Sequence, residues 1–387
     1  MRDAVIVEAV RTPVGRRKGS LSGIHPVDLS AVVLRALADR AGLDPDLVDD
    51  VVWGCVNQVG EQSANVARSA VLAARWAEKV PGTTVDRQCG SSQQAISFAA
   101  ASVIAGHADI VVAGGVESMS RVPMGSAKKA GPGVPFGPEV ARRYDDFAFN
   151  QGTGAEILAR RYDLSRTRLD EYSIESHSRA AQAIDDGRFV KQIAPVELPD
   201  GGVLSVDEGV RRQSTLEALG ALEPAFEPDG RITAGNASQI SDGAAALLIT
   251  TSERARSLGL EPLARVHTAT VVGDDPITML AGPIPATAKA LALAGLALED
   301  IDTFEVNEAF ASVVGAWLAE TGADPSRVNP NGGAIALGHP LGGSGARIAT
   351  TLLHHLDTEG MRYGLQTMCE GGGMANATIF ENLRTPR

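Results

Sequence analysis

Short runs of β-branched residues alternate with amphipathic helical stretches along this 387-residue chain, and this alternation limits the folds that it can adopt. Residues 4–10 and 51–56 have the character of buried strands, and a helical stretch that opens at Asp28 lies between them. Such alternation is typical of α/β proteins, in which helices cover largely buried sheets. At roughly 150 residues per domain, the length allows two or three domains. We therefore predict an α/β fold with more than one domain.

Residues 121–140 interrupt the alternation with a density of glycine and proline that the interior of a helix or strand does not tolerate. A helix is predicted from Ser165 to a stop at Gly187, and regular strand character returns only near residues 243–250. We expect the segment between to form an inserted loop domain.

A faint internal repeat links two distant parts of the chain. Residues 111–115 and 365–373 both have the pattern of apolar strands that end in glycines, and each follows a helix start rich in small residues, near Cys89 and near Gly343. Strands that end in two glycines also recur by chance, so the match alone is compatible with two similar halves or with coincidence.

Composition and charge exclude several classes of protein. With 44% hydrophobic and 21% charged residues, the chain is globular rather than disordered. Its net charge of −12 would repel a nucleic acid, and its short basic clusters lack interleaved aromatic residues, so we expect no nucleic-acid partner. The charge does not exclude a small ligand that carries phosphate.

The sequence also bears on where the protein works. No run approaches the roughly 18 to 20 apolar residues of a membrane span, so we expect no membrane association. Glu8 interrupts the apolar N-terminal stretch, which therefore has the pattern of a first strand rather than of a signal peptide. Three cysteines, an odd number over a long chain, favour a reducing compartment. We predict a cytoplasmic protein.

Cys89 is the first candidate for chemistry. A strand-like run ends near Asp86, and a helix of small residues begins just after the cysteine. The unsatisfied amides and the dipole of a helix N-terminus favour an anion, so we expect a stabilised thiolate there. The alternative is a small buried hydrophobic residue, which is the interpretation that we prefer for Cys55 in its apolar surroundings.

Glycines concentrate in residues 331–373, which hold eleven of the 42 in the chain. They serve either turns or a site where a substrate lies against main-chain N–H groups, and the reactive side chains nearby favour the second interpretation. His339 is one of these side chains, with flanking glycines that keep bulk away from its ring. We expect this imidazole to reach a substrate, and the other histidines to be surface or packing residues.

Two more candidates lie at the predicted ends of strands, where ligands of α/β proteins generally bind. Cys369 follows a strand over residues 364–368, and Asn307 closes a strand over residues 303–306. Asn307 would serve equally well as a helix cap. The cysteines and His339 match no zinc-ligand spacing, so we predict no metal site.

These segments together resemble the thiolases. The motifs that carry the likeness occur in the thiolase order over nearly the whole chain and are Cys89-Gly-Ser, Thr233-Ala-Gly-Asn-Ala-Ser, Ser241-Asp-Gly-Ala-Ala-Ala, Asn307-Glu-Ala-Phe, Asn331-Gly-Gly-Ala-Ile-Ala-Leu-Gly-His-Pro and Cys369-Glu-Gly-Gly-Gly. We place the chain nearest to actinobacterial degradative 3-ketoacyl-CoA thiolases, including ones assigned to sterol breakdown.

The resemblance implies a thiolase-like fold, with two similar five-layered α/β halves and an inserted loop domain. We expect residues 1–118 and 244–262 to form the N-terminal half, residues 119–243 the loop domain, and residues 263–387 the C-terminal half. The resemblance further implies a homodimer or homotetramer that binds an acyl-CoA. It implies coenzyme A as co-substrate and no tightly bound cofactor.

The resemblance also assigns roles to the candidate residues. Cys89, activated by His339, attacks a 3-ketoacyl-CoA, and acetyl-CoA leaves from the acyl-cysteine enzyme. His339 and a water held by Asn307 stabilise one oxyanion, and the main-chain amides of Cys89 and Gly371 stabilise a second. Cys369 exchanges the proton at C2. Coenzyme A then takes the acyl group, and the reverse reaction is a Claisen condensation.

Contacts with coenzyme A are implied for Arg211, Ser238, Phe310 and Gln151. Many short-chain thiolases have a His-Met pair where this chain has Asn150-Gln151, and a polar Gln151 changes the acyl pocket. This departure disfavours a dedicated biosynthetic acetyltransferase that forms acetoacetyl-CoA, which stays as the alternative.

Activities of other classes fit less well. An acyl-CoA thioester hydrolase also uses a Cys–His pair but has no use for a second thiol such as Cys369. A decarboxylating condensing enzyme is expected to have a second histidine in place of Asn307. A non-catalytic coenzyme A-binding or scaffold protein would tolerate the loss of Cys89 or His339, but this sequence has both in full motifs. We therefore predict thiolysis, as in fatty-acid β-oxidation or sterol degradation.

Overall fold

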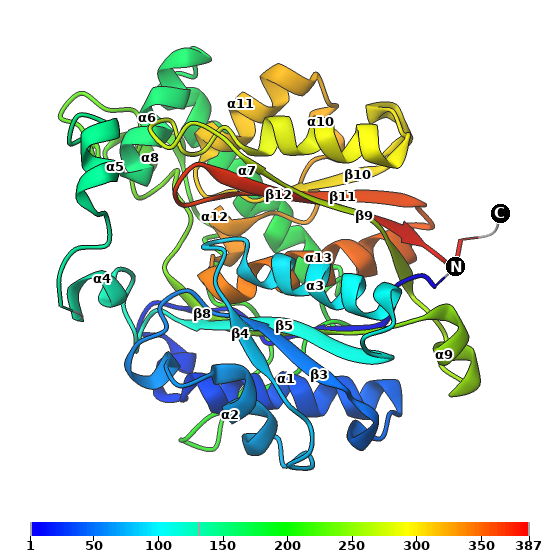
Figure 1. The fold of residues 1–387 in the computed structure, drawn as a ribbon. Coiled ribbons are helices and arrows are strands. Elements are labelled where there is room, and N and C mark those ends of the chain that lie inside the picture. Colours follow the sequence, from blue (N-terminus) through cyan, green and yellow to red (C-terminus); the bar gives the residue numbers. More distant parts are fainter. Residues whose placement is uncertain (1, 131, 386–387) are drawn as a thin grey trace.

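The computed structural model describes residues 2–130 and 132–385, which form five alternating layers of helix and sheet (Figure 1). The strands form one hydrogen-bonded sheet that folds into two layers, joined by a short antiparallel pairing of residues 5–6 with residues 264–265. These two sheet layers lie on either side of a central layer of two helices, and further helices cover the outer face of each. The five layers belong to the two halves of the chain together. The α/β fold predicted from the sequence is confirmed.

The sheet of the N-terminal half has the strand order β4-β3-β5-β8-β1. β3 is parallel to β4 and β5, and β8 is antiparallel to β5 and β1. The strands are β1 (Val5–Arg11), the short β2 (Gly15–Arg16) that pairs with β8, β3 (Asp50–Gly54), β4 (Thr83–Val85), β5 (Ile110–Ser118) and β8 (Ser241–Thr250).

The C-terminal half repeats this arrangement in the order β10-β11-β12-β9. β10 is parallel to β11, and β12 is antiparallel to β11 and β9, as β8 is to β5 and β1. The strands are β9 (Ala264–Gly273), β10 (Thr303–Val306), β11 (Tyr363–Glu370) and β12 (Met374–Asn382). The two segments of the faint sequence repeat form the equivalent strands β5 and β11, so the interpretation as two similar halves is confirmed.

The two central helices, α3 (Ser91–Ala105) and α13 (Leu341–Glu359), lie side by side between the sheets (Figure 1). A helix in this layer needs small or apolar residues on nearly every face, and α13 is buried along nearly its whole length. A Cβ on Gly345 would lie 2.7 Å from Cβ of Gln93, so a glycine is needed where the helices approach. Because both residues lie near the start of their helices, both helices begin at the same end of the layer.

Amphipathic helices form the outer layers. α1 packs against β1 and β8, and α10 packs against β9 and β12 in the equivalent place. The helices outside the central layer and the loop region are α1 (Pro26–Ala41), α2 (Val66–Ala73), α9 (Ser252–Ser257), α10 (Pro283–Ala294), α11 (Ala311–Thr321) and α12 (Ala334–Leu337), with 3₁₀ turns at Ser20–Gly23, Pro45–Leu47, Gly60–Gln62, Leu298–Asp300 and Pro325–Arg327. The helix predicted to open at Asp28 begins slightly earlier, because Pro26 fits its first turn and His25 caps it.

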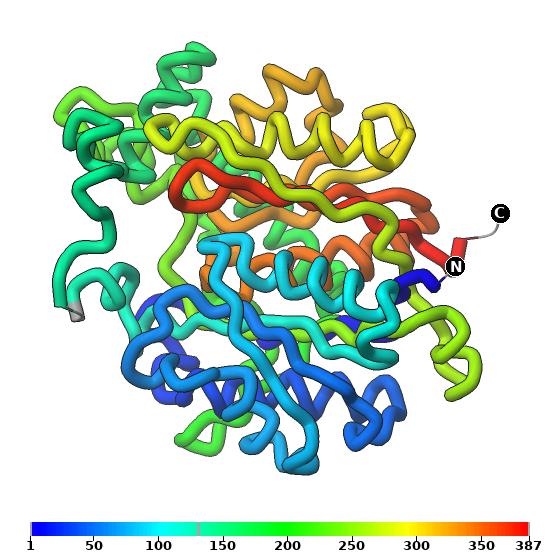
Figure 2. Tube along the Cα trace, viewed as in Figure 1, coloured from blue at the N-terminus to red at the C-terminus, as the bar shows by residue number. Residues whose placement is uncertain are grey.

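Between β5 and β8 the chain leaves the layers and forms a loop region, residues 119–240, much of which lies on the side opposite the ends of the described chain (Figure 2). Its elements are α4 (Ser126–Ala130), α5 (Pro138–Arg143), α6 (Gln151–Arg161), α7 (Arg166–Asp185), β6 (Val196–Glu197), β7 (Val203–Leu204) and α8 (Leu216–Gly220). The helix predicted from Ser165 is confirmed as α7, with Ser165 as its N-cap.

Two short helices, α4 and α5, fit among the glycines and prolines of residues 121–140, where no helix was expected. The predicted domain limits, with a loop domain over residues 119–243, stay a prediction. The outermost of these limits, residues 1 and 387, lie outside the described residues.

We predict that Gly345→Ala destabilises the protein, because the added methyl group has no space between the central helices. Overpacking of this kind costs about 1–3 kcal/mol, which urea unfolding followed by circular dichroism would detect. Gly220→Ala is the matched control, because no atom lies within 4 Å of a Cβ at that position. Its unfolding free energy should change by no more than about 0.5 kcal/mol, and equal stability of the two variants would contradict the packing argument.

Candidate active site

A cavity of about 770 Å³ lies where the loop region meets the two halves. Cys89, Phe310 and Gly371 line it from the halves, and Gln151 and Phe226 line it from the loop region. The structure therefore brings four residues that were predicted from the sequence, Cys89, Gln151, Phe310 and Gly371, to one cavity.

Cys89 lies just before α3, whose N-cap is Gly90, as the sequence predicted. The prediction of a stabilised thiolate is wrong for the free protein. Burial, aided by the negative charge of Glu370, raises the pKa of the Cys89 thiol to about 12. The main-chain N–H groups of Cys89 and Gly371 act in the opposite direction and are outweighed. Cys89 is therefore a neutral thiol before a substrate binds.

His339 lies between α12 and α13 and is 4% exposed. Its Nδ1 lies 2.6 Å from Ser344 Oγ, and that hydroxyl donates its single proton to the carbonyl of Pro340 at 2.9 Å. Nδ1 must therefore carry a proton and donate it to Ser344, an assignment that follows from the hydrogen-bond network. This tautomer leaves a lone pair on Nε2, which lies 3.5 Å from Nδ2 of Asn307.

Burial also keeps His339 neutral. It lowers the pKa of the imidazole to about 3, and the positive charge of Arg347 acts in the same direction. Leu341, at the start of α13, packs in one apolar cluster with Cys89. A neutral thiol and a neutral imidazole with a lone pair at Nε2 therefore lie at the same end of the central layer.

Cys369 comes from the C-terminal half. It lies within β11 rather than after it, because the strand continues to Glu370 and pairs Cys369 with Ala375 of β12. Burial raises the pKa of Cys369 well above its ordinary value, and the charge of Cys89 contributes in the same direction. Thiols from different halves of the chain are thus close enough for their charges to interact.

Asn307 follows β10, and its amide donates to the carbonyl of Thr367 at 3.0 Å. The alternative role as a helix cap is wrong, because α11 begins at Ala311 with Phe310 as its N-cap. The neighbouring carboxylate of Glu308 ties this segment to α7 and α12, and it accepts hydrogen bonds from Tyr172 Oη, Ser176 Oγ, Asn329 Nδ2 and the amide of Ile335.

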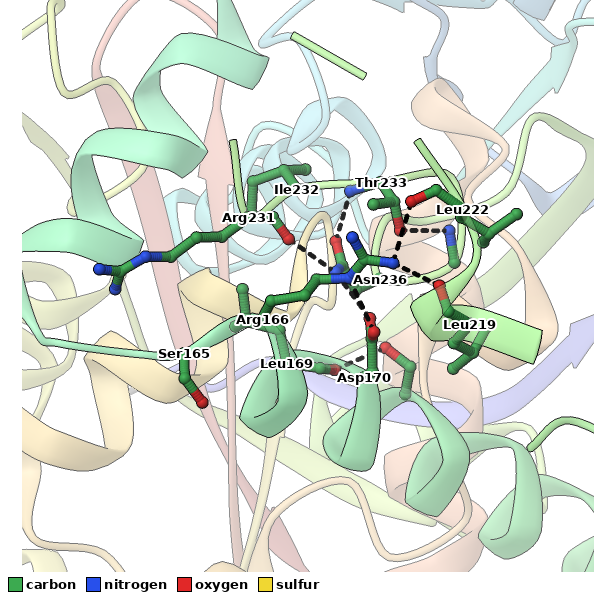
Figure 3. A network of polar contacts seen from close by, with 12 residues as sticks. Ser165, Arg166, Leu169, Asp170, Leu219, Leu222, Arg231, Ile232, Thr233 and Asn236 are labelled. Carbon is green, nitrogen blue, oxygen red and sulfur yellow. Dashed lines mark hydrogen bonds and ion pairs between the residues drawn. The ribbon is translucent and has the colours of Figure 1, made fainter. Parts of the chain in front are cut away.

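A second polar network joins α7 to Asn236, near the end of the loop region (Figure 3). Asp170 on α7 accepts from Arg166 Nε at 2.7 Å and from Asn236 Nδ2 at 2.9 Å. The carbonyl of Asn236 in turn accepts from the amide of Ala311 at 2.9 Å. The network therefore fixes the loop region against the start of α11.

Ser238 and Arg211 lie outside the cavity lining. The amide of Ser238 donates to the carbonyl of Ala309 at 2.9 Å, which places it beside the cavity wall. Arg211 is exposed and has no ion pair within the part of the chain that the structure describes, whereas Arg212 pairs with Asp185 at 2.8 Å. Arg211 is thus available to an anionic ligand.

No group of three or more His, Cys, Asp or Glu side chains in residues 2–130 and 132–385 is placed to hold a metal ion. Among the same described residues, no helix combines the length and the apolar character that crossing a membrane requires.

Two family models match this chain. The thiolase N-terminal domain matches residues 4–253, and the thiolase C-terminal domain matches residues 260–382. The chain belongs to the thiolase family.

Known thiolases are similar over their full length. The chain is 52% identical over 389 residues to the steroid 3-ketoacyl-CoA thiolase FadA6 of Mycobacterium tuberculosis, an alignment that covers 99% of this chain and 95% of that protein. It is 45% identical to the 3-ketoacyl-CoA thiolase of Citrobacter koseri over 100% of both chains. It is 47% identical to that of Yersinia pestis over 99% of this chain and 100% of the relative. The resemblance predicted from the motifs is confirmed.

The geometry adds residues to this thiolase site that the motifs did not single out. Phe226 lies edge to face with Phe310, with ring centroids 6.0 Å apart, and Gly152 has no side chain to overlap Phe226. No sequence signal identifies Phe226. Ser344 could have been found, because it lies five residues after His339 in the same motif.

Most glycines of residues 331–373 in this thiolase do not line the cavity, which corrects the interpretation that they face a substrate. A Cβ on Gly342, for example, would lie 2.6 Å from Cα of Cys55, which is fully buried in the core as predicted. Of this group, Gly371 and Gly372 line the cavity.

We predict that Ser344→Ala lowers the thiolase rate constant about 10- to 100-fold, because Nδ1 of His339 loses the acceptor that sets its tautomer and ring orientation. Steady-state kinetics measure the effect, and circular dichroism checks the fold. Thr350→Val is the matched control, because it removes a buried hydroxyl of the same helix that bonds the carbonyl of Ala346. The control should keep its rate within about threefold, and unchanged turnover in Ser344→Ala would show that another group sets the tautomer.

Proposed function

We propose that this thiolase cleaves a 3-ketoacyl-CoA with coenzyme A and gives acetyl-CoA and a shortened acyl-CoA. The observation that carries the proposal is the arrangement near the starts of the central helices. Cys89 lines the cavity and lies near Cys369 of the other half, and His339, which is outside the lining, has a lone pair at Nε2. Two thiols suit a reaction in which one sulfur carries the acyl group and the other exchanges protons.

In the first half of the reaction, Cys89 gives its proton to Nε2 of His339, and its sulfur forms a bond to C3 of the substrate. The C2–C3 bond breaks, its electron pair goes to C2, and the resulting enolate of acetyl-CoA takes a proton from Cys369. Acetyl-CoA leaves. The imidazolium and the Cys369 thiolate carry opposite charges, so the buried site gains no net charge.

Coenzyme A completes the cycle. Its thiol gives a proton to the Cys369 thiolate, and its sulfur attacks the acyl group on Cys89. The sulfur of Cys89 leaves and takes back the proton held by His339, so all three groups return to their neutral forms. The reverse sequence condenses two thioesters.

Negative charge develops on two carbonyl oxygens during these steps. We propose that His339 and a water held by Asn307 stabilise the thioester oxygen. The contact between the side chains of His339 and Asn307 supports this role. We propose that the main-chain amides of Cys89 and Gly371 stabilise the oxygen at C3. Both N–H groups lower the pKa of the Cys89 thiol, which supports their proximity to this site.

The relatives and the cavity favour a degradative role. The similar proteins carry the names 3-ketoacyl-CoA thiolase and steroid 3-ketoacyl-CoA thiolase. A cavity of about 770 Å³ with Phe149, Phe226 and Phe310 in its wall favours an acyl group larger than acetoacetyl. Fatty-acid β-oxidation and steroid degradation provide such substrates. Coenzyme A serves as co-substrate, and the family uses no tightly bound cofactor.

As an extension of the family resemblance, we propose that the protein works in the cytoplasm as a homodimer or homotetramer. Light scattering of the purified protein gives the number of subunits directly.

We predict that Cys89→Ala lowers thiolysis about 10³-fold or more, because the sulfur that forms the bond is lost. The assay follows coenzyme A-dependent release of acetyl-CoA from 3-ketoacyl-CoA esters with short, long and ring-bearing acyl groups. Mass analysis of the parent protein should locate the acyl group on Cys89. Cys55→Ala is the matched control, because Cys55 is buried outside the site and does not line the cavity.

Cleavage by Cys89→Ala at the parent rate would contradict this role. Hydrolysis without uptake of coenzyme A would favour a hydrolase, and activity confined to acetoacetyl-CoA would favour the biosynthetic alternative.

We predict that Arg211→Ala raises the KM for coenzyme A about 5- to 10-fold with little change in kcat, because an exposed guanidinium that forms no ion pair with any described residue suits the phosphates of the coenzyme. Arg212→Ala is the matched control, since Arg212 is already paired with Asp185. Equal KM values for the two variants would remove Arg211 from the coenzyme site.

A further inference from the structure

Glu370 is a buried carboxyl group directly after Cys369, and the reaction proposed above does not use it. Its side chain reaches from β11 to the start of α3. A Cβ on Gly90 would overlap Oε1 of Glu370 and would lie 2.6 Å from Nδ2 of Asn376, so the carboxyl group occupies the space directly over the N-cap of α3.

Neither oxygen of Glu370 has a hydrogen-bond partner in residues 2–130 and 132–385. Asn376, its neighbour on β12, donates Nδ2 to the carbonyl of Gly90 at 3.1 Å instead. Arg87, whose charge acts on Glu370, forms no ion pair with it among the described residues, and its Nη1 lies 3.9 Å from the sulfur of Met374. A carboxylate here would therefore be a poorly compensated charge.

The charged and titratable groups around Glu370 come from three directions. The turn before α3 provides Asp86, Arg87 and Cys89, and β11 provides Cys369. β12 faces Glu370 with the uncharged Asn376. Burial raises the pKa of Glu370 to about 8, while Arg87 lowers it and Asp86 raises it.

Glu370 and Cys89 compete for one helix terminus. α3 has no side-chain cap and no acidic residue in its first turn, and the carboxyl group of Glu370 lies over its N-cap. The dipole of a helix N-terminus is equivalent to roughly half a positive charge, so it compensates one nearby anion and not two. The negative charge of Glu370 raises the pKa of Cys89. Glu117 on β5 also raises this pKa, by a smaller amount.

We propose that Glu370 is a positioning residue that decides whether Cys89 can carry negative charge. A neutral carboxyl group leaves the start of α3 available to the Cys89 thiolate, and an ionised carboxylate takes that place. In the acyl-transfer reaction, on whose proposal this inference rests, Glu370 would therefore slow attack by Cys89 when its carboxyl group ionises at alkaline pH.

The test measures alkylation of Cys89 by iodoacetamide, which requires a thiolate but no thiolase turnover. The parent protein and Glu370→Gln are compared from about pH 6.5 to about pH 9.5, and peptide mass analysis gives the rate at Cys89 alone. Below the pKa of Glu370 both proteins have a neutral side chain there, so their rates should agree within about twofold. At about pH 9.5 only the parent has a carboxylate, and Glu370→Gln should react about tenfold faster.

Two further variants serve as controls. Glu370→Asp retains a titrating carboxyl group and should retain the slower reaction at high pH. Glu305→Gln removes another buried carboxyl group whose pKa is raised to about 8, but which is not among the groups that affect Cys89, so its alkylation profile should match the parent. If Glu370→Gln does not fold, Glu370→Met replaces it as the uncharged variant.

A ratio of rates that does not rise with pH would overturn the inference, because a purely structural change alters the rate at both ends of the range alike. Thiolysis is assayed on the same samples. Absence of thiolysis in the parent would contradict the proposed function and leave the alkylation result to decide on Glu370 by itself.

Discussion

The close approach of the two central helices is the constraint on which the site depends. α3 and α13 come from different halves, and both begin at the same end of the layer, where Gly345 lets the main chain of Gln93 come near. Larger residues there would push the helices apart. Since Cys89 precedes α3 and His339 precedes α13, the same separation would move the thiol away from the imidazole.

Burial at this junction determines the charges of the reacting groups. It raises the pKa values of Cys89 and Cys369 and lowers that of His339, so all three are neutral before a substrate arrives. In the reaction that we propose, proton transfer among them creates charges in opposite pairs, so the protein does not have to hold a net charge where water is scarce. The amides at the start of α3 then act on charge that develops during the reaction rather than on a resting thiolate.

The sequence motifs predict several of the segments that meet at the cavity, but they do not predict the charges of the side chains there. The position of Cys89 before a helix follows from local patterns, since a strand-like run and small helix-forming residues flank it. The direction of its pKa does not, because packing against residues of α13 and β11 buries the thiol and Glu370 adds a negative charge nearby. Cys369 was placed after its strand for a similar reason, since pairing with β12 extends β11 to Glu370. Phe226 reaches the cavity only through the tertiary position of the loop region, which leaves no local pattern.

Different regions of the protein supply the reacting groups and part of the wall of the cavity. The groups that we propose to exchange protons lie on β11 and in the turns that precede the two central helices, whereas Gln151 and Phe226 bring the loop region to the cavity wall. Two buried polar networks, at Glu308 and at Asp170, attach this region to the segment from Asn307 to the start of α11. Substitutions within the cavity wall can therefore change the acyl group that fits while both networks keep Asn307 in place against His339. Substitutions in the networks act differently, because they release the segment that holds Asn307 and so alter the chemistry along with the fit.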